Sequence, residues 1–116
     1  MADERRRRGD LGEDAVARTL ARRGYAVLER QYRCRWGEID IIARDPEGVL
    51  CFVEVKTRSD AGFAPARAAV TPSKQRKLRI AAGCYLAERG LECRCRFDVA
   101  EVYWASRSIN YIINAF

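Results

Sequence analysis

The chain has 116 residues, of which 48% are hydrophobic and 33% charged, and its formal net charge is +6. A chain of this length predicts a single globular domain with its own core, and no apolar run approaches the ~18 residues that span a bilayer. The sequence contains no histidine, which excludes Ser-His-Asp and Cys-His catalysis, histidine-base nucleases and most zinc enzymes. Any catalysis would therefore depend on carboxylates, lysine and an oxygen-bound metal. The positive charge favours an anionic partner, of which nucleic acid is the commonest.

The N-terminal segment has acidic residues followed by a run of arginines, without the apolar core of a signal peptide. The five cysteines form no C-x-x-C pair, and we interpret them as buried free thiols in a reducing compartment. Both features favour the cytoplasm. Residues 1–9 are expected to form a basic, disordered arm, which either attracts phosphate or is only solvated. Residues 10–116 are expected to form the domain.

A first helix is predicted from Asp10 to Arg23, with Asp10 as its N-cap and Gly24 as its stop. Glu13 follows the cap by three residues, as in a capping box. It also shares a stripe with the apolar side chains at positions 16, 17 and 20. Two interpretations are open: Glu13 only caps its helix, or it reaches inward toward a metal site.

Three segments then show the alternation typical of strands: residues 25–33, 37–44 and 49–57. Between the last two, Asp45-Pro46-Glu47-Gly48 fits a three-residue hairpin loop with Gly48 in the left-handed conformation. Counting outward from this loop sets Asp40 opposite Glu54, with Lys56 on the same face. Directly opposed carboxylates lie about 5 Å apart at Cβ and repel each other. The hairpin therefore predicts a site for a divalent cation with a lysine at its edge.

A second helix is predicted over residues 72–89, with Thr71 as N-cap and Gly90 as stop. Its buried face is expected to be Leu78, Ala81, Ala82 and Tyr85. Two further strands are predicted within residues 91–103 and 109–113. The fold class is therefore α/β, with the order α-β-β-β-α-β-β and a mixed sheet flanked by helices.

Several side chains in this half are candidate contacts for phosphate: Arg58 and Arg67 in the loop of residues 58–70, and Lys74, Gln75 and Lys77 on the second helix. The cations at the start of the helix oppose its dipole, which prefers acids there. An external anion explains this cluster, and so does a solvated basic face.

The acidic residue Asp40, followed on the next strand by Glu54-Val55-Lys56, resembles the signature of the PD-(D/E)XK nuclease superfamily, whose fold is that of restriction endonucleases. From Leu11 onward, the chain is also similar to the YraN-like family of uncharacterised bacterial proteins. The segments that carry this second resemblance are Gly12-Glu13, Gly37-Glu38-Ile39-Asp40-Ile41-Ile42-Ala43, Phe52-Val53-Glu54-Val55-Lys56-Thr57-Arg58 and Asn114-Ala115-Phe116.

The YraN-like family is similar in fold to archaeal Holliday-junction resolvases, which also carry an acidic residue on the first helix, at the place of Glu13. The chain departs from the family at Phe63-Ala64, where Phe-Gly is expected. The resemblance therefore leaves the shape of the 58–70 loop open, but it does not affect the predicted metal site.

The chemical properties of these side chains indicate a role for each of them. Asp40 and Glu54 are hard oxygen ligands suited to Mg²⁺ or Mn²⁺, and the backbone carbonyl of Val55 is expected to help them. Lys56 is expected to orient a water or to stabilise charge on the phosphate. The alternative is an exposed ion pair between Glu54 and Lys56 without function.

Two other acids have supporting roles. Glu13 is expected to position the water shell of the metal or to complete a second metal site. Glu38 lies opposite Lys56 in the predicted register, so it either tunes the lysine or pairs with it.

The sequence therefore predicts a metal-dependent nuclease that hydrolyses phosphodiester bonds in DNA, with branched or structured DNA as one substrate class. Two alternatives stay open: a non-catalytic nucleic-acid-binding module with the same fold, and a protein-interaction subunit of a larger complex. The expected partner is DNA and not a membrane. A homodimer is one of the oligomeric states that the sequence allows.

Overall fold

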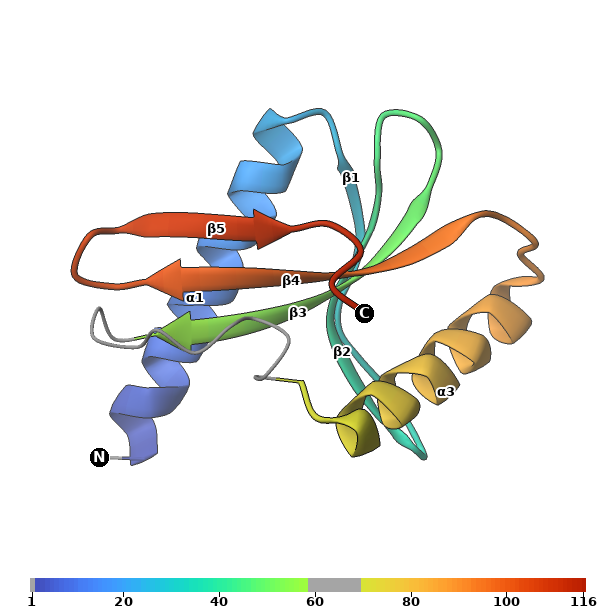
Figure 1. Ribbon diagram of the computed structural model, residues 1–116, viewed down its shortest axis with the longest axis horizontal. Helices are drawn as coiled ribbons and strands as arrows, with labels where there is room; N and C mark the ends of the chain where they lie inside the picture. Colours follow the sequence, from blue (N-terminus) through green and yellow to red (C-terminus); the bar gives the residue numbers. More distant parts are fainter. Residues whose placement is uncertain (1, 59–69) are drawn as a thin grey trace.

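The computed structural model describes the backbone of residues 2–58 and 70–116, and all of their side chains except those of residues 2–6 and 8. The elements are α1 (Ala2–Arg22), β1 (Ala26–Cys34), β2 (Gly37–Arg44), β3 (Leu50–Arg58), α3 (Pro72–Arg89), β4 (Cys95–Tyr103) and β5 (Ser108–Ile112). The strands form one sheet in the order β1-β2-β3-β4-β5 (Figure 1). β3 and β4 are parallel, and the other neighbouring strands are antiparallel. The predicted α-β-β-β-α-β-β order and mixed sheet are confirmed.

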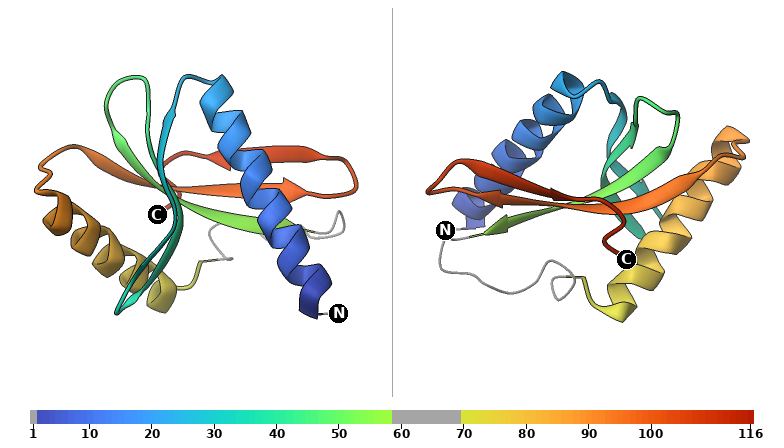
Figure 2. Two further views of the ribbon diagram at one scale, coloured as in Figure 1. Left: turned by 180° about the vertical axis from the view of Figure 1, so that it is seen from behind. Right: turned by 45° about the horizontal axis from the view of Figure 1, so that its top comes forward.

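The two helices pack against opposite faces of the sheet. On one face, Val16 and Leu20 of α1 pack against Ile41 and Val53, and the left view of Figure 2 shows α1 lying across the strands. On the other face, the buried residues of α3 pack against Ile42, Phe52 and Val99, among others. These α3 residues are Leu78, Ala81, Ala82 and Tyr85, as predicted. The sheet therefore has one apolar core on each of its faces.

The first helix begins at Ala2 and not at Asp10. The expectation of a disordered arm at residues 1–9 is therefore wrong for residues 2–9, and Asp10 is not an N-cap. The run contains alanine, glutamate and several arginines, which are strong helix formers. These propensities extend the helix through Gly9 to the start of the chain, and Glu13 is left three turns inside it, too far from the end to cap it.

The loop between β2 and β3 has the predicted conformation. Gly48 has φ 88°, its N–H donates to the carbonyl of Asp45 at 3.0 Å, and the N–H of Asp45 donates to the carbonyl of Val49 at 2.9 Å. The Asp45 carboxylate also accepts from the N–H groups of Glu47 and Val49. The two strands that the loop connects have the predicted register: Arg44 pairs with Leu50, and Ile41 pairs with Val53.

The ends of α3 are also as predicted. The hydroxyl of Thr71 accepts from the N–H of Lys74 at 3.2 Å, and Gly90 ends the helix with φ 61°. In β1, by contrast, a register shift lies between Val27 and Glu29. Glu29 therefore leaves the face of Val27 and pairs with Arg89 at the end of α3.

β4 begins at Cys95, later than predicted, and both Cys93 and Cys95 are exposed. All five cysteines are free thiols, and Cys51 is buried. Among the described residues, no helix is long and apolar enough to cross a membrane.

Candidate metal and catalytic site

β2 and β3 separate at the residue where the sequence places its first acid. The ladder ends at the Ile41–Val53 pair, and the next residue, Asp40, accepts a hydrogen bond through Oδ2 from the N–H of Val55 at 2.8 Å. The carboxylate of Asp40 thus takes the place of a strand carbonyl. In an extended strand, the N–H and C=O of one residue point to the same side. The carbonyl of Val55 therefore faces this fork as well.

Glu54 lies one residue past the last ladder pair and is buried, with an exposed fraction of 7%. Its Oε1 atom lies 2.8 Å from Nζ of Lys74 and 3.4 Å from Nζ of Lys56. Two ammonium groups from different elements, α3 and β3, thus converge on one carboxylate oxygen. We call Asp40, Glu54, Val55, Lys56 and Lys74 the fork site.

Electrostatics show that the acids of the fork site act on each other. Burial raises the pKa of Asp40 to about 7, and the charges of Glu54 and Glu13 act in the same direction. The hydrogen bond from Val55 and the charge of Lys74 oppose this shift. Burial and the nearby acids therefore make the charged form of Asp40 unfavourable, and a proton or a cation beside it offsets that cost.

The two lysines differ in how firmly they hold their protons. Burial and the neighbouring Lys74 lower the pKa of Lys56, although Glu54 acts in the opposite direction. Burial also acts to lower the pKa of Lys74, but its hydrogen bonds to Glu54 and Lys56 and the charges of Glu54 and Asp40 together outweigh this and raise it. Lys74 is therefore a fixed cation, and Lys56 gives up a proton more readily than an ordinary lysine does.

Glu13 reaches the same region from α1. It is buried, with an exposed fraction of 6%, and Oε1 accepts from Nε of Arg30 at 3.0 Å. It lines a pocket of about 620 Å³ together with Asp40 and Val55. The complete lining of this pocket is Gly9, Asp10, Glu13, Gln31, Arg33, Glu38, Asp40, Val55 and Thr57. Glu13 is thus near Asp40, on the α1 side of the fork, whereas Lys74 approaches Glu54 from α3.

The predicted phosphate contacts separate into different environments. Nε of Arg58 pairs with the buried Glu101 of β4 at 3.3 Å, and the Gln75 amide donates to the carbonyl of Val70 at 2.9 Å. Both are thus occupied by internal contacts. Lys74 joins the fork site, and Lys77 is exposed. Arg67 and the Phe63-Ala64 departure lie outside the described residues.

Two contacts differ from the sequence-based expectation or were missed by it. Glu38 pairs with Arg33 across β1 and β2 at 3.1 Å, and not with Lys56. The reason is that β2 has already left β3 at this point. The pairing of Arg30 with Glu13 was missed, because nothing local in the sequence shows which strand residue meets a helical acid.

The residues present fit a divalent cation bound partly by the protein. Among the described residues, no group of three or more His, Cys, Asp or Glu side chains could hold a metal ion. The donors available at the fork are the carboxylates of Asp40 and Glu54 and the carbonyl of Val55. Mg²⁺ usually keeps several waters and takes only one or two carboxylates, so this small donor set suits it.

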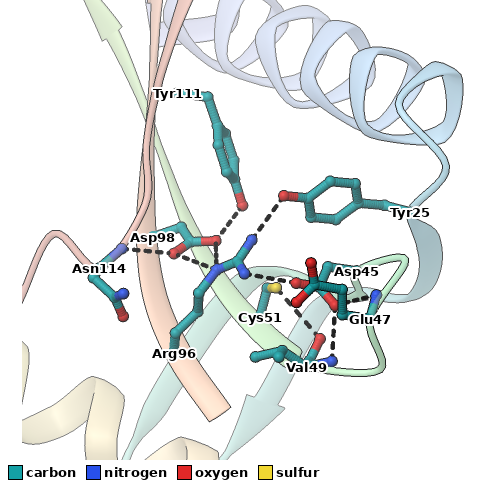
Figure 3. Close-up of polar contacts among 9 residues, drawn as sticks. All are labelled: Tyr25, Asp45, Glu47, Val49, Cys51, Arg96, Asp98, Tyr111 and Asn114. Carbon is teal, nitrogen blue, oxygen red and sulfur yellow. Dashed lines mark hydrogen bonds and ion pairs between the residues drawn. The ribbon is translucent and has the colours of Figure 1, made fainter. Parts of the chain in front are cut away.

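A second buried polar cluster lies toward the other end of β3 and β4, and Figure 3 shows it. Nε of Arg96 donates to both oxygens of Asp98, at 3.1 and 3.0 Å. Its terminal nitrogens donate to Asp45 and to the hydroxyl of Tyr25, both at 2.7 Å. We call this the Arg96 cluster.

The rest of the Arg96 cluster surrounds Asp98, which has no exposed surface. The hydroxyl of Tyr111 donates to Oδ2 at 2.5 Å, and the N–H of Asn114 donates to Oδ1 at 3.0 Å. Burial and the charge of Asp98 raise the pKa of Tyr111. This cluster was missed in the sequence, because Arg96 and Asp98 alternate like ordinary residues of a solvated strand face.

Comparison with known proteins places the chain among a set of bacterial relatives. The family described as "Uncharacterised protein family UPF0102" matches residues 12–102. A UPF0102 protein of Moorella thermoacetica is 49% identical over 108 residues, which cover 92% of this chain and 88% of the relative. One from Pelobacter propionicus is 43% identical over 118 residues, covering 97% and 84%. One from Desulforamulus reducens is 39% identical over 121 residues, covering 99% of each.

Proposed function

The chain belongs to the uncharacterised protein family UPF0102, and we propose that it is a divalent-metal-dependent nuclease that hydrolyses phosphodiester bonds in DNA. Membership agrees with the resemblance to the YraN-like family. Assignment to the PD-(D/E)XK superfamily, with its restriction-endonuclease-like fold, is part of this proposal. So are a Mg²⁺ or Mn²⁺ cofactor and a location in the cytoplasm.

One observation carries the proposal. At the fork, Asp40 and Glu54 follow the last ladder pair of a hairpin, and burial and repulsion raise the pKa of Asp40 to about 7. A buried pair of acids is unfavourable unless a cation or a proton compensates it. A carboxylate beside a pocket whose pKa is shifted by burial and by a neighbouring charge is a candidate functional residue.

The residues of the chain have distinct roles in this proposal. Asp40, Glu54 and the carbonyl of Val55 hold the cation, and the hydrogen bond from the N–H of Val55 fixes the orientation of Asp40. When bound, the cation supplies Lewis acidity to a phosphate oxygen and lowers the pKa of a coordinated water. Lys56 would orient a water or donate to a phosphate oxygen, where developing charge is stabilised.

Two further residues position these groups. Lys74 keeps Oε1 of Glu54 in place through its 2.8 Å contact. Glu13 borders the pocket on the α1 side and contributes negative charge that orders the water around a cation. Its pairing with Arg30 holds the carboxylate in the helix–sheet interface.

The test is cleavage of a panel of linear, flapped and four-way-junction DNAs by the purified protein with Mn²⁺. We expect cleavage of at least one DNA, and a loss of at least about a hundredfold in Asp40→Asn, Glu54→Gln and Lys56→Ala, the scale of removing an electrostatic catalytic group. Glu92→Gln is the matched control, because Glu92 is exposed and far along the chain from the fork. Cleavage at the wild-type rate in all three variants would contradict the proposal.

A non-catalytic nucleic-acid-binding module is the second candidate function, and one observation favours it. Lys56 and Lys74 both contact Glu54, so part of the acidic charge is neutralised without a cation. In that case the fold binds DNA with the lysines holding the fork together. The same panel separates the two functions, since a binding module retains DNA in the presence of Mn²⁺ without cutting it.

A further inference from the structure

The tip of the β1–β2 hairpin carries an exposed tryptophan. Trp36 has an exposed fraction of 54%, and it is the aromatic member of the exposed large apolar side chains in the described part of the chain. Its backbone N–H donates to Sγ of Cys34 at 3.4 Å, and Cys34 pairs with Gly37, which closes the turn. The backbone that carries the indole is thus held in a short, hydrogen-bonded turn, and more than half of the side chain is exposed to solvent. A single exposed apolar residue alone indicates nothing, so its surroundings decide its meaning.

Cations lie at the Trp36 ring and around its turn. The guanidinium carbon of Arg35 lies 5.2 Å from the ring centroid, and Arg33, which pairs with Glu38, has a side chain that is 74% exposed. Lys77 of α3 also approaches the turn, because its Cβ lies 3.8 Å from the position that a Cβ on Gly37 would take. Figure 1 shows the hairpin tip beside the first turns of α3. A flat aromatic surface bordered by cations suits a nucleotide, which offers a base to stack on and phosphates to neutralise.

The hairpin tip is also continuous with the pocket of the fork site. Arg33 and Glu38, on either side of the turn, line the same pocket as Asp40. At about 3.3 Å per strand residue, Trp36 lies about 13 Å along β2 from Asp40. This is roughly the length of four stacked bases at 3.4 Å each. A strand that is held at the tip therefore reaches the fork within a few nucleotides.

We propose that Trp36 is a stacking platform that holds an unpaired nucleotide near the fork, so that the protein binds DNA with a single-stranded or branched region in preference to continuous duplex. This inference rests on the proposed function and names its substrate class. The physical reason is that stacking on an aromatic side chain needs the face of a base, and an intact duplex keeps its base faces covered. Arg35 and Lys77 bind the flanking phosphates without regard to sequence.

Tryptophan fluorescence in the presence of a chelator tests this directly. The chain has two tryptophans, so a Trp104→Phe variant reports Trp36 alone, and Trp36→Phe reports Trp104 as the control. We expect a single-stranded oligothymidylate and a flapped DNA to quench the emission of Trp36, and a blunt duplex of the same length to leave it nearly unchanged. The emission of Trp104 should respond to none of them. Absence of quenching by every DNA, whether or not it binds, would overturn the inference.

Binding of the variants gives a second measure. Trp36→Leu keeps the apolar bulk but removes the aromatic face, and Trp36→Phe keeps an aromatic face. We expect Trp36→Leu to bind single-stranded DNA between roughly fivefold and a hundredfold more weakly, the range for one base stacked on an aromatic side chain, and Trp36→Phe to stay near the wild type. Arg35→Ala should also weaken binding, more than the charge-matched Arg94→Ala, whose side chain is exposed outside the hairpin. Trp36→Leu that binds single strands as tightly as the wild type would contradict a stacking role.

These measurements also separate the inference from the proposed function. Because they are made in chelator, they do not depend on catalysis. Quenching of Trp36 without any cleavage in Mn²⁺ would support stacking and contradict the nuclease, and cleavage without quenching would do the reverse.

Discussion

The fork site and the Arg96 cluster are both groups of charged side chains that are partly or fully buried on the same sheet, but they differ in how well the charges are satisfied. In the Arg96 cluster, Asp98 accepts hydrogen bonds from a guanidinium, a hydroxyl and a backbone N–H. Each nitrogen of the Arg96 guanidinium in turn has an acceptor. At the fork, Asp40 accepts a hydrogen bond from one backbone N–H and has a raised pKa. Burial alone therefore does not distinguish the two clusters. What distinguishes them is the raised pKa of Asp40 at the fork.

The largest expected effect on stability is in the Arg96 cluster. Arg96→Met keeps much of the side-chain volume but leaves Asp98 buried without its cation, which should destabilise the protein by about 3–5 kcal/mol. The exposed Arg94→Met is the matched control and should change stability by less than about 0.5 kcal/mol. Urea denaturation of both variants measures this. Equal, small effects would show that the Arg96 cluster is not a closed structural network.

The next effect concerns metal at the fork. Mn²⁺ at a hundredfold excess over its dissociation constant should stabilise the wild-type protein by about 2.7 kcal/mol, because it binds the native state alone. Asp40→Asn should lose most of this response, whereas Glu92→Gln should keep it. Thermal melts with Mn²⁺ and with chelator give the comparison. A response that survives in Asp40→Asn would place the cation elsewhere in the molecule.

The smallest expected effect is on the stability of the metal-free protein. Its sign distinguishes the two clusters, because loss of a charge should destabilise the Arg96 cluster but stabilise the fork. Asp40→Asn removes a charge opposite Glu54 but keeps an acceptor for Val55, so in chelator it should stabilise the protein by about 0.5–1 kcal/mol near neutral pH. The pKa of Asp40 is raised from 3.8 to about 7, so the native state binds this proton more tightly than the unfolded chain does. The stability contribution of Asp40 is therefore greatest below about pH 4 and is lost as the pH rises toward 7.

The advantage of Asp40→Asn should accordingly vanish in acid and grow between those two pH values. Melts of both proteins over this range measure the difference. A difference that is constant with pH would mean that Asp40 is an ordinary, solvated carboxylate.

The features that the sequence predicted well are those that local geometry determines. The conformation of the Asp45–Gly48 loop follows from its own residues, and that loop determines the register that leads to Asp40 and Glu54. Thr71 and Gly90 likewise set the ends of α3 through backbone contacts within a turn.

The features that were missed depend on neighbours that are distant in sequence. Glu38 was assigned to Lys56 because the ladder was extended past the fork, and only the pairing of β2 with β1 shows that the two strands have separated. Arg58 was predicted to contact phosphate, but it pairs with Glu101 of β4, a residue distant in sequence. The burial of Asp98 needs Tyr111 and Arg96 together, which no window of sequence contains. The start of α1 was predicted too late for a different reason. Asp10 was given more weight as a cap than the strong helix propensities of the residues before it.

The contacts of Asp98 with Tyr111 and Asn114 also bear on the order in which the protein assembles during synthesis. The β2–β3 hairpin that carries Asp40 and Glu54 is a local structure, and hairpins close within microseconds of being available. Asp98 emerges from the ribosome before Tyr111 and Asn114, its last two partners, and the parallel pairing of β3 with β4 must wait for the α3 crossover. We therefore expect the acids of the fork to be in register while the nascent chain still lacks its closing polar contacts. The far end of the sheet becomes stable only when β5 and the residues after it are released.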